Sequence, residues 1–374
     1  MTGTLRRTGA LTAFRLGAPL PRDPITELLA AHRFRSIADA SSELDSVGWI
    51  TQADPSGDTI GDDDVLLGRA SWLTMRVDRK RVPPKWLQNE LAALAKSRGR
   101  ALSARERKEA RADLVQNLLP RVLPSTAQVD ALLTRDQVFV LSSSRAAVEA
   151  FARLWFATFG VGLVELGPQA LALDLVDREL TAAVEQLQPT RWPLSSRAAE
   201  GPAVQGSLGL DTTDGFLGEE FLLWLWFLCE NLEGEVVLHD GELAGVAIVD
   251  LIEFAALGDD DTVPRLNGGT PTRTPEARAA LRRGRRVARL RLLVAVRDQQ
   301  WTVTIDGPSL RCSGVRLPED PEDCETAEDR TEHRCSSWAD LHRVVRALFR
   351  EFVCIRLSPD WEDAARRVAA WMRA

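Results

Sequence analysis

The chain has 374 residues, of which 45% are hydrophobic and 27% charged, and this is the composition of a folded globular protein rather than a disordered one. This length is enough for one large domain or for two to three smaller ones. The longest apolar run, Phe221 to Cys229, is far shorter than the roughly 20 residues of a membrane-spanning helix. Met1 to Leu20 contains no apolar stretch of signal-peptide length. We therefore expect a cytoplasmic protein.

Charge is distributed unevenly, although the formal net charge is only −7. Residues 76–122 hold thirteen Lys or Arg against five Asp or Glu, and residues 273–297 hold nine arginines against Glu276 alone. Between Asp211 and Asp261 there are fourteen acidic residues and no Lys or Arg, and a second acidic run extends from Glu319 to Glu332. Such segregation indicates one strongly positive surface that suits a polyanion. The alternative is that the basic segments are solvated or pair with the acidic ones inside the fold.

The first predicted elements are a strand at Ala10–Leu16 and a helix at Asp23–His32, with Pro24 in its first turn. A Gly-, Asp- and Ser-rich loop is expected over Asp54–Asp64, and one or two strands follow in Val65–Val77. This order predicts an α+β section over residues 1–80.

Two helices with a basic tip are expected over residues 81–122. Pro83 and Pro84 open a helix that runs to about Ser97, and Ser103 with Glu106 forms a capping-box pattern that starts a second helix. The second helix is basic in its first half and apolar in its second half. We therefore expect its far end to be anchored in a core while its near end projects charge into solvent.

The remaining pattern predicts two further sections, residues 123–195 and residues 205–374. The first contains a strand, a helix and a strand, and Pro189–Ser207 is a loop or linker. The second begins with an intensely apolar, buried helix and continues with two hairpins and two helices. The predicted elements are Gln137–Ser142, Ser144–Phe159, Val161–Leu166, Leu217–Glu230, Glu235–His239 with Leu243–Asp250, Ala288–Val296 with Trp301–Ile305, Trp338–Phe352 and Pro359–Met372.

Residues 48–166 together resemble the RdgC family. The resemblance begins at Gly48–Trp49 and continues at Arg76, Lys80 and Pro83, which are similar to the family's R-x-x-x-K-x-x-P lead-in to its helical arm. It is most specific in the segment GRALSARERKEARADLVQNLLPR, residues 99–121, which ends in the family's L-L-P-R. The following VDALLTRDQVFVLSSSRAAVEA resembles the family's strand and small-residue-led helix.

The resemblance implies an α+β subunit of several parts, with mixed small sheets and a two-helix basic arm, that forms a ring-shaped homodimer. Duplex DNA is expected to pass through a positively charged hole, with little sequence preference and without catalysis. The implied partners are double-stranded DNA and a RecA-type recombinase that the protein restrains, in a nucleoid-associated location and without a cofactor. After Leu166 little matches the shorter members, although FLGEEFLLWLWF resembles a longer branch. The bulky aromatic residues that some members carry after L-P-R are absent from Val122–Gln128.

A binder that ignores sequence must read the phosphate backbone, for which arginine and lysine are suited. We expect such contacts from the arm and its lead-in, and a second basic cluster before the later hairpin is either a DNA contact or a solvated hairpin edge. The predicted DNA-binding residues are Arg76, Arg79, Lys80, Arg81, Lys85, Arg98, Arg100, Arg105, Arg107, Lys108, Arg111 and Arg121, together with Arg282, Arg283, Arg285 and Arg286.

Three other functions compete with DNA binding. A metal-dependent nuclease would use the acidic triplet Asp259–Asp261 or the pair Asp240 and Glu242, but no carboxylate pair lies at a recognisable nuclease spacing from a lysine. A protein-interaction scaffold without DNA binding would use Leu217–Glu230 as a docking helix. A zinc site would require Cys312, Cys324, His333 and Cys335, which lack a C-x-x-C knuckle, so free cysteines are the expected state.

Overall fold

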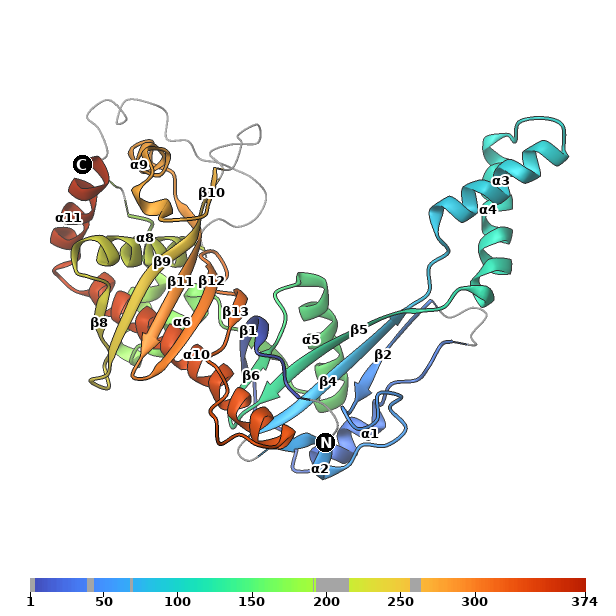
Figure 1. Ribbon diagram of the computed structural model, residues 1–374, viewed down its shortest axis with the longest axis horizontal. Coiled ribbons are helices and arrows are strands. Elements are labelled where there is room, and N and C mark those ends of the chain that lie inside the picture. The colour runs from blue at the N-terminus through green and yellow to red at the C-terminus, as the bar shows by residue number, and fades with distance from the viewer. Residues whose placement is uncertain (1–3, 39–43, 68–69, 191, 193–214, 256–263) are drawn as a thin grey trace. The chain divides into compact units, whose positions relative to one another are not determined.

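A computed structural model of the chain describes residues 4–38, 44–67, 70–190, 192, 215–255 and 264–374 (Figure 1). The chain divides into two compact units. Unit 1 contains Ala18–Arg135 and Glu149–Gly162, and unit 2 contains Thr4–Gly17, Asp136–Val148 and Leu163–Ala374. Both units combine helices with antiparallel strands, so the fold class is α+β, as predicted.

The units are not the four consecutive sections that the sequence predicts. Strand β1 (Thr8–Leu16) pairs antiparallel with β13 (Cys312–Arg316), so the first strand of the chain belongs with its C-terminal part. Likewise the helix α5 (Arg145–Phe159) begins in unit 2 and continues in unit 1. The predicted linker at Pro189–Ser207 lies almost wholly outside the described residues.

Unit 1 is built on an antiparallel sheet in which β4 (Ala70–Arg79) lies between β2 (Asp45–Ile50) and β5 (Ser125–Leu133). The short β3 (Leu66–Leu67) also pairs with β4, so the strand signal in Val65–Val77 corresponds to β3 and β4. Two short helices, α1 (Ile25–Ala31) and α2 (Asp62–Val65), complete this part. Strand β5 has no counterpart among the predicted elements.

The core of unit 1 is centred on Trp49. Its side chain is 1% exposed, and its ring lies edge-on to Phe151 with centroids 5.5 Å apart. The indole Nε1 donates a hydrogen bond to Thr158 Oγ1 at 2.7 Å. Helix α5 therefore packs on the sheet through a buried contact that is both apolar and hydrogen-bonded.

Unit 2 contains a longer antiparallel sheet with the strand order β10–β9–β11–β12–β13–β1–β6. Strand β7 pairs with β1, and β8 pairs with β9. The two predicted hairpins are β8 with β9 and β11 with β12. The bounds are β6 Gln137–Val140, β7 Leu163–Glu165, β8 Glu235–Val237, β9 Leu243–Phe254, β10 Arg265–Asn267, β11 Val287–Val296 and β12 Gln299–Asp306. Unit 2 is thus built on one extended sheet rather than on small separate ones.

The helices of unit 2 confirm the predicted buried helix and the two C-terminal helices. The buried helix is α8, which packs against β9 and β11, while α10 and α11 pack against α8. The bounds are α6 Pro168–Leu175, α7 Thr181–Glu185, α8 Phe216–Asn231, α9 Pro275–Arg282, α10 Ala327–Leu357 and α11 Trp361–Arg373. Short 3-10 turns lie at Leu119–Arg121 in unit 1 and at Arg178–Leu180 and Pro271–Arg273 in unit 2.

Helix α8 is apolar around nearly its whole circumference, and accordingly most of its residues are buried. Phe221 packs edge-on against Phe349 of α10 at 5.2 Å, and Trp226 packs edge-on against Trp371 of α11 at 5.6 Å. The predicted burial of this helix is confirmed. In the part of the chain that the structure describes, no helix is long and apolar enough to cross a membrane.

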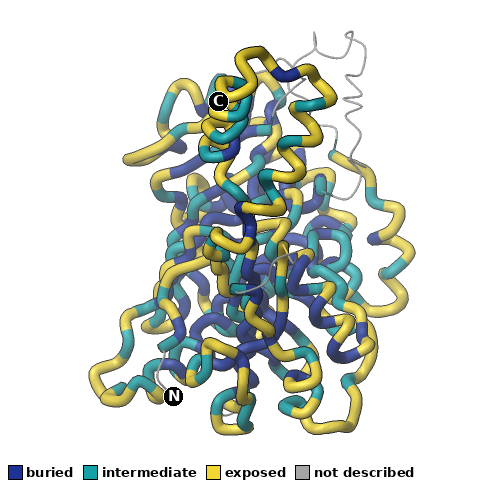
Figure 2. Tube along the Cα trace, turned by 90° about the vertical axis from the view of Figure 1, so that its right-hand side faces the viewer, coloured by how far each residue is buried: buried dark blue, intermediate teal, exposed yellow. Residues whose placement is uncertain are grey.

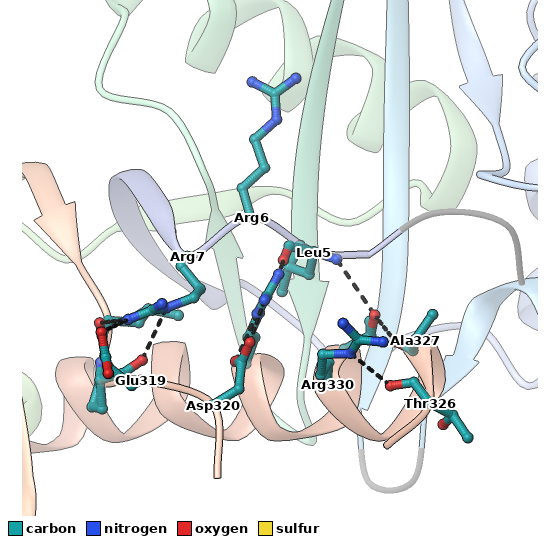
Figure 3. Close-up of polar contacts among 12 residues, drawn as sticks. Leu5, Arg6, Arg7, Glu319, Asp320, Thr326, Ala327 and Arg330 are labelled. Carbon is teal, nitrogen blue, oxygen red and sulfur yellow. Dashed lines mark hydrogen bonds and ion pairs between the residues drawn. The ribbon is translucent and has the colours of Figure 1, made fainter. Parts of the chain in front are cut away.

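The N-terminal segment of unit 2 lies along the start of α10, as Figure 3 shows. The Leu5 backbone N–H donates to Thr331 Oγ1 at 3.4 Å, and Arg7 pairs with Glu319 at 3.8 Å. The Arg334 guanidinium donates to Asp320 at 2.8 Å and to the Leu5 carbonyl at 2.6 Å. The acidic run at Glu319–Glu332 therefore leads into α10 and takes part in these ion pairs.

Gly48 allows two backbones of unit 1 to approach closely. A Cβ at this position would lie 2.4 Å from Phe34 Cα, because the Phe34 N–H donates to the Trp49 carbonyl and the Trp49 N–H donates to the His32 carbonyl. We expect Gly48→Ala to lower the free energy of unfolding by about 1–3 kcal/mol, since the backbones must separate. Urea unfolding followed by tryptophan fluorescence measures this change. Gly162→Ala is the control, since an added Cβ meets no atom within 4 Å there, and equal stability losses in both variants would contradict the prediction.

Candidate nucleic-acid interface

The two-helix arm of unit 1 consists of α3 (Pro84–Ser97) and α4 (Ala104–Leu118), as the sequence predicts. The arm follows β4 and precedes β5, and Figure 1 shows both helices beyond the ends of these strands. Leu87, Leu102 and Leu118 are buried, but exposed residues, yellow in Figure 2, predominate along the arm. The arm thus has anchored points and a large solvent-facing surface.

The turn between the arm helices is organised by Glu106. Its carboxylate accepts a hydrogen bond from the Ser103 backbone N–H at 2.9 Å, and Ser103 Oγ accepts from the Glu106 N–H at 3.3 Å, which completes the predicted capping box. Arg100 also donates to this carboxylate, at 2.6 and 2.9 Å, and Arg98 lies 3.4 Å away. The hydrogen bond from Arg100, followed by those from Ser103, lowers the pKa of Glu106 to about 2. Arg98 and Arg100 therefore hold the turn together.

Helix α4 carries a stripe of cations, which we define as Arg107, Lys108 and Arg111. Positions three and four apart lie on the same side of a helix, so these three side chains share one face. All three are exposed, and they make no ion pair or hydrogen bond with any described residue. Arg105, in contrast, pairs with Glu109 at 2.9 Å. The same exposed, unpaired state holds among the described residues for Arg81, Lys85, Lys96 and Arg121.

Lys96 was missed by sequence reasoning as a candidate contact. It lies in the last turn of α3 and is exposed. Its position inside the basic segment 76–122 is the signal that could have identified it.

The cationic stripe opposes the electrostatic preference of its own helix. The first turn of a helix favours negative charge because its backbone N–H groups have no partners within the helix. Arg107 and Lys108 lie at the end of this turn and directly after it, and Arg111 adds a like charge four residues after Arg107 and three after Lys108. Helix stability alone does not explain this placement, which is typical of residues selected for another purpose.

Arg76, at the start of the predicted DNA-binding lead-in, is a structural residue. It donates to both carboxylate oxygens of Asp78, at 2.9 and 2.8 Å, and to the Pro55 carbonyl at 2.8 Å. Its guanidinium also lies over the Phe34 ring at 4.3 Å. Since Asp78 is fully buried, Arg76 supplies the charge that keeps this carboxylate in the fold. Arg79 is half-exposed and pairs with Asp45 at 3.4 Å.

Lys80 does not fit the prediction that it contacts DNA. Its side chain is 0% exposed, and its ammonium donates a hydrogen bond to the Ala38 carbonyl at 2.7 Å. The Lys80 backbone N–H is also bound, to the Leu44 carbonyl at 2.7 Å. A phosphate contact would require this packing to open, so we remove Lys80 from the candidate interface.

The second basic segment, residues 273–297, lies in unit 2 and pairs largely with the acidic block at 211–261. These ion pairs are the arrangement that the sequence left open as the alternative to a free basic surface. The pairs are Arg278 with Glu230, Arg286 with Glu219, Arg289 with Glu253, Arg291 with Asp250 and Arg297 with Glu242. The charge of this segment is therefore mostly compensated within unit 2.

The predicted cluster Arg282–Arg286 begins at the last residue of α9, and its members differ in their surroundings. Arg282 donates to the Ala374 carbonyl at 2.9 Å, and Arg286 lies 2.9 Å from Glu219. Arg285 is 9% exposed and donates to the Ala255 carbonyl at 3.5 Å, so it does not present its charge on an exposed surface that DNA could contact. Arg283 is exposed, with no ion pair to a described residue.

The acidic residues of the nuclease alternative are only partly described. Asp259–Asp261 lie outside the described residues. Asp240 and Glu242 flank a turn as predicted, and Arg343 lies 3.5 Å from the first and 3.0 Å from the second. Glu242 also pairs with Arg297. These two carboxylates are thus held by arginines.

The residues of the zinc alternative are not grouped as a metal site. Among the described residues, no three His, Cys, Asp or Glu side chains are grouped so that they could hold a metal ion. Cys312 is buried, which raises the pKa of its thiol to about 12. His342 is also buried, with its ring centroid 4.9 Å from that of Phe139, and burial lowers the pKa of His342 to about 4. Both side chains act as core residues.

We expect truncation of Arg76 to lower the free energy of unfolding and truncation of a stripe residue to leave it nearly unchanged. Arg76→Ala leaves the buried Asp78 carboxylate without its charge partner, so the free energy of unfolding should fall by about 3 kcal/mol. Arg107→Ala removes an exposed, unpaired side chain and should change it by no more than about 0.5 kcal/mol. Chemical denaturation of both variants measures the difference. Equal stabilities of Arg76→Ala and the unmodified protein would show that Arg76 has no such structural role.

The family match with known proteins concerns the N-terminal part of the chain. Residues 10–169 match the model of the RdgC family, whose description reads "Putative exonuclease, RdgC". The chain is also similar to the recombination-associated protein RdgC of Psychromonas ingrahamii, with 24% identity over 156 residues. This alignment covers 40% of the chain and 51% of that protein, so the chain spans about half the length of the curated relative that it matches. Over residues 10–169, which include the whole two-helix arm, the chain is thus similar to the RdgC family.

Proposed function

We propose that the chain binds double-stranded DNA without sequence preference through its two-helix arm, and that it does so without catalysis. The observation that carries this proposal is the stripe of exposed, uncompensated cations on α4. Phosphates recur along any duplex, so a rigid helix that presents several cations on one face can contact them whatever the base sequence. Lys85 and Lys96 are exposed on α3, Arg81 is exposed before α3 and Arg121 after α4, and all four add to this surface.

The proposal includes assembly and a biological role. A homodimeric ring with the arms directed inward would concentrate positive charge in its hole while the remaining surface stays acidic, which is compatible with a net charge of −7. The family match over residues 10–169 and the name of the similar protein support a role in recombination. In this role the protein would occupy duplex DNA in the nucleoid and restrain a RecA-type recombinase.

An exonuclease is the second candidate, and the family description favours it. Hydrolysis of DNA with two metal ions needs carboxylates that are free to bind Mg²⁺. The arginine contacts of Asp240 and Glu242 count against their use in this way. We nevertheless propose that the chain does not cleave DNA. Incubation of the duplex with the protein and Mg²⁺ tests this part of the proposal.

The DNA-binding proposal predicts a specific salt dependence. Binding of unrelated fluorescent duplexes, followed by anisotropy, should weaken steeply as salt rises. The triple variant Arg107→Ala, Lys108→Ala, Arg111→Ala should bind more weakly, and its slope of log K against log salt should be shallower by about 0.9 for each DNA phosphate that it no longer neutralises. A matched control removes three arginines of α11, Arg366, Arg367 and Arg373, and should leave the slope nearly unchanged.

The same titration separates the alternatives. No binding at low salt by folded protein would overturn the proposal and favour a protein-interaction scaffold. Equal slopes for the stripe variant and the α11 control would place the DNA contact elsewhere. Loss of full-length duplex on incubation with Mg²⁺, abolished by EDTA, would favour the exonuclease.

Assembly and the effect on recombination form a further prediction. Sedimentation equilibrium should give twice the chain mass of 41.3 kDa. The unmodified protein should slow strand exchange by a RecA-type recombinase, because duplex held by the dimer is less accessible to it. The stripe variant should dimerise normally but show little of this inhibition. A monomeric protein, or equal inhibition by the stripe variant, would contradict this part of the proposal.

A further inference from the structure

Unit 2 contains a cavity of about 210 Å³ that neither the arm nor the family match explains. Its wall is formed by the start of α8, the residues around the start of β11, the end of α11, and Pro189, Thr190 and Trp192. Phe216, Leu223, Val287 and Met372 make much of the lining apolar. An apolar cavity of about 150 Å³ can take up benzene, so this one is large enough for a small substituted ring.

The cavity also contains a buried carboxylate whose charge is poorly compensated. The side chain of Glu219 is 7% exposed, and its ion-pair partner is Arg286, at 2.9 Å, which is 52% exposed. Burial raises the pKa of Glu219 to about 7 in spite of this arginine. The loss of hydration thus raises the pKa of Glu219 by more than the single ion pair lowers it, and the carboxylate can accept a further hydrogen bond.

Glu220, the neighbouring carboxylate, is already satisfied. It accepts hydrogen bonds from the Thr190 backbone N–H at 2.6 Å and from Arg356 Nε at 2.9 Å. Arg356 in turn lies over the Trp361 ring at 4.7 Å. Glu220 therefore helps to build the wall, and the unused hydrogen-bonding capacity belongs to Glu219.

Two further groups at the cavity have unused hydrogen-bonding capacity. The Thr190 hydroxyl is buried, and among the described residues it has no hydrogen-bond partner. Arg286 has several N–H donors, of which the Glu219 ion pair engages only part. Since buried polar groups are almost always paired in native proteins, the Thr190 hydroxyl indicates a polar ligand, and the remaining N–H groups of Arg286 are available to the same ligand.

The charge balance around the cavity narrows the ligand class. An organic cation would suit Glu219 but would be repelled by Arg285 and Arg286, which also line the cavity. An anion would suit the arginines but would meet Glu219 and Glu220. A neutral ring with an N–H beside a carbonyl satisfies both signs, because its N–H can donate to Glu219 while its carbonyl accepts from Arg286.

We propose that this cavity is a binding site for a planar lactam heterocycle, of the kind presented by the edge of guanine or uracil. The ring lies between the apolar walls, and the lactam edge faces Glu219 and Arg286. The base reaches the site either as a free nucleoside or as an unpaired base in a nucleic acid. This proposal stands independently of DNA binding by the arm.

Isothermal titration calorimetry of the full chain with guanosine and uridine tests the proposal. We expect saturable binding of at least one of them. Adenosine lacks the ring carbonyl, and 1-methylguanosine and 3-methyluridine lack the lactam N–H. Their affinity should therefore be lower by about tenfold or more. Equal affinity for the methylated compounds would overturn the assignment of the edge. No binding of guanosine or uridine by folded protein would overturn the site.

Substitutions locate the site and distinguish the source of the base. Glu219→Gln keeps the side-chain volume but removes the charge, and it should weaken binding by about tenfold. Arg283→Ala, a nearby exposed arginine outside the cavity lining, is the control and should leave binding unchanged. Binding that is insensitive to Glu219→Gln, in protein with an unaltered circular dichroism spectrum, would show that the ligand lies elsewhere.

The stripe variant of α4 makes the two proposals separable. It should retain nucleoside binding, because the cavity lies in unit 2 and the stripe lies in unit 1. If the base comes from nucleic acid, the stripe variant should bind a single-stranded oligonucleotide of thymine, which carries the same edge as uracil, better than one of adenine. If the base comes from a free nucleoside, it should bind neither oligonucleotide, while guanosine or uridine still binds.

Discussion

Unit 2 depends on the pairing of its first strand with strands from distant parts of the chain. β1 forms hydrogen bonds to β13 through residues 8–11 and to β6 through residues 12–15. Without β1, the edges of β13 and β6 would have no such backbone partners, and an unpaired buried peptide group is costly. The contacts of Leu5 and Arg7 with α10 and the residues before it fix the segment that enters β1. The N-terminal residues therefore complete a sheet whose other strands come mostly from the C-terminal part of the chain.

Features that depend on neighbouring residues could be predicted from the sequence. The capping box at Ser103 and Glu106 is a local hydrogen-bonding pattern, and the helix begins there as expected. The apolar composition of Phe216–Asn231 similarly allowed its burial to be predicted, because no exposed helix has a hydrophobic surface on every side. Strand β5 was not predicted, since its first four residues are exposed and carry no alternating apolar signal.

Features that depend on remote segments could not be predicted in this way. Lys80 and Arg285 are charged residues in basic stretches, and their sequence context favours exposure. Their burial is made possible by the carbonyl groups of Ala38 and Ala255, which the fold brings within hydrogen-bonding distance. The same limit applies to the cavity at Glu219. It takes its lining from four separated segments, and no local motif marks it.

The two basic segments are both strongly positive in the sequence, but only the one in unit 2 is largely ion-paired in the fold. In unit 2 the arginines of residues 273–297 meet the carboxylates of residues 211–261, so charges that are segregated along the chain become paired in space. In the arm the acidic residues are too few for this, and Glu106 is already engaged by Arg98 and Arg100. The cations of α4 thus stay uncompensated in a protein whose net charge is negative. A polyanion would respond to this local excess, because at physiological ionic strength the field of distant carboxylates is screened within about 8 Å.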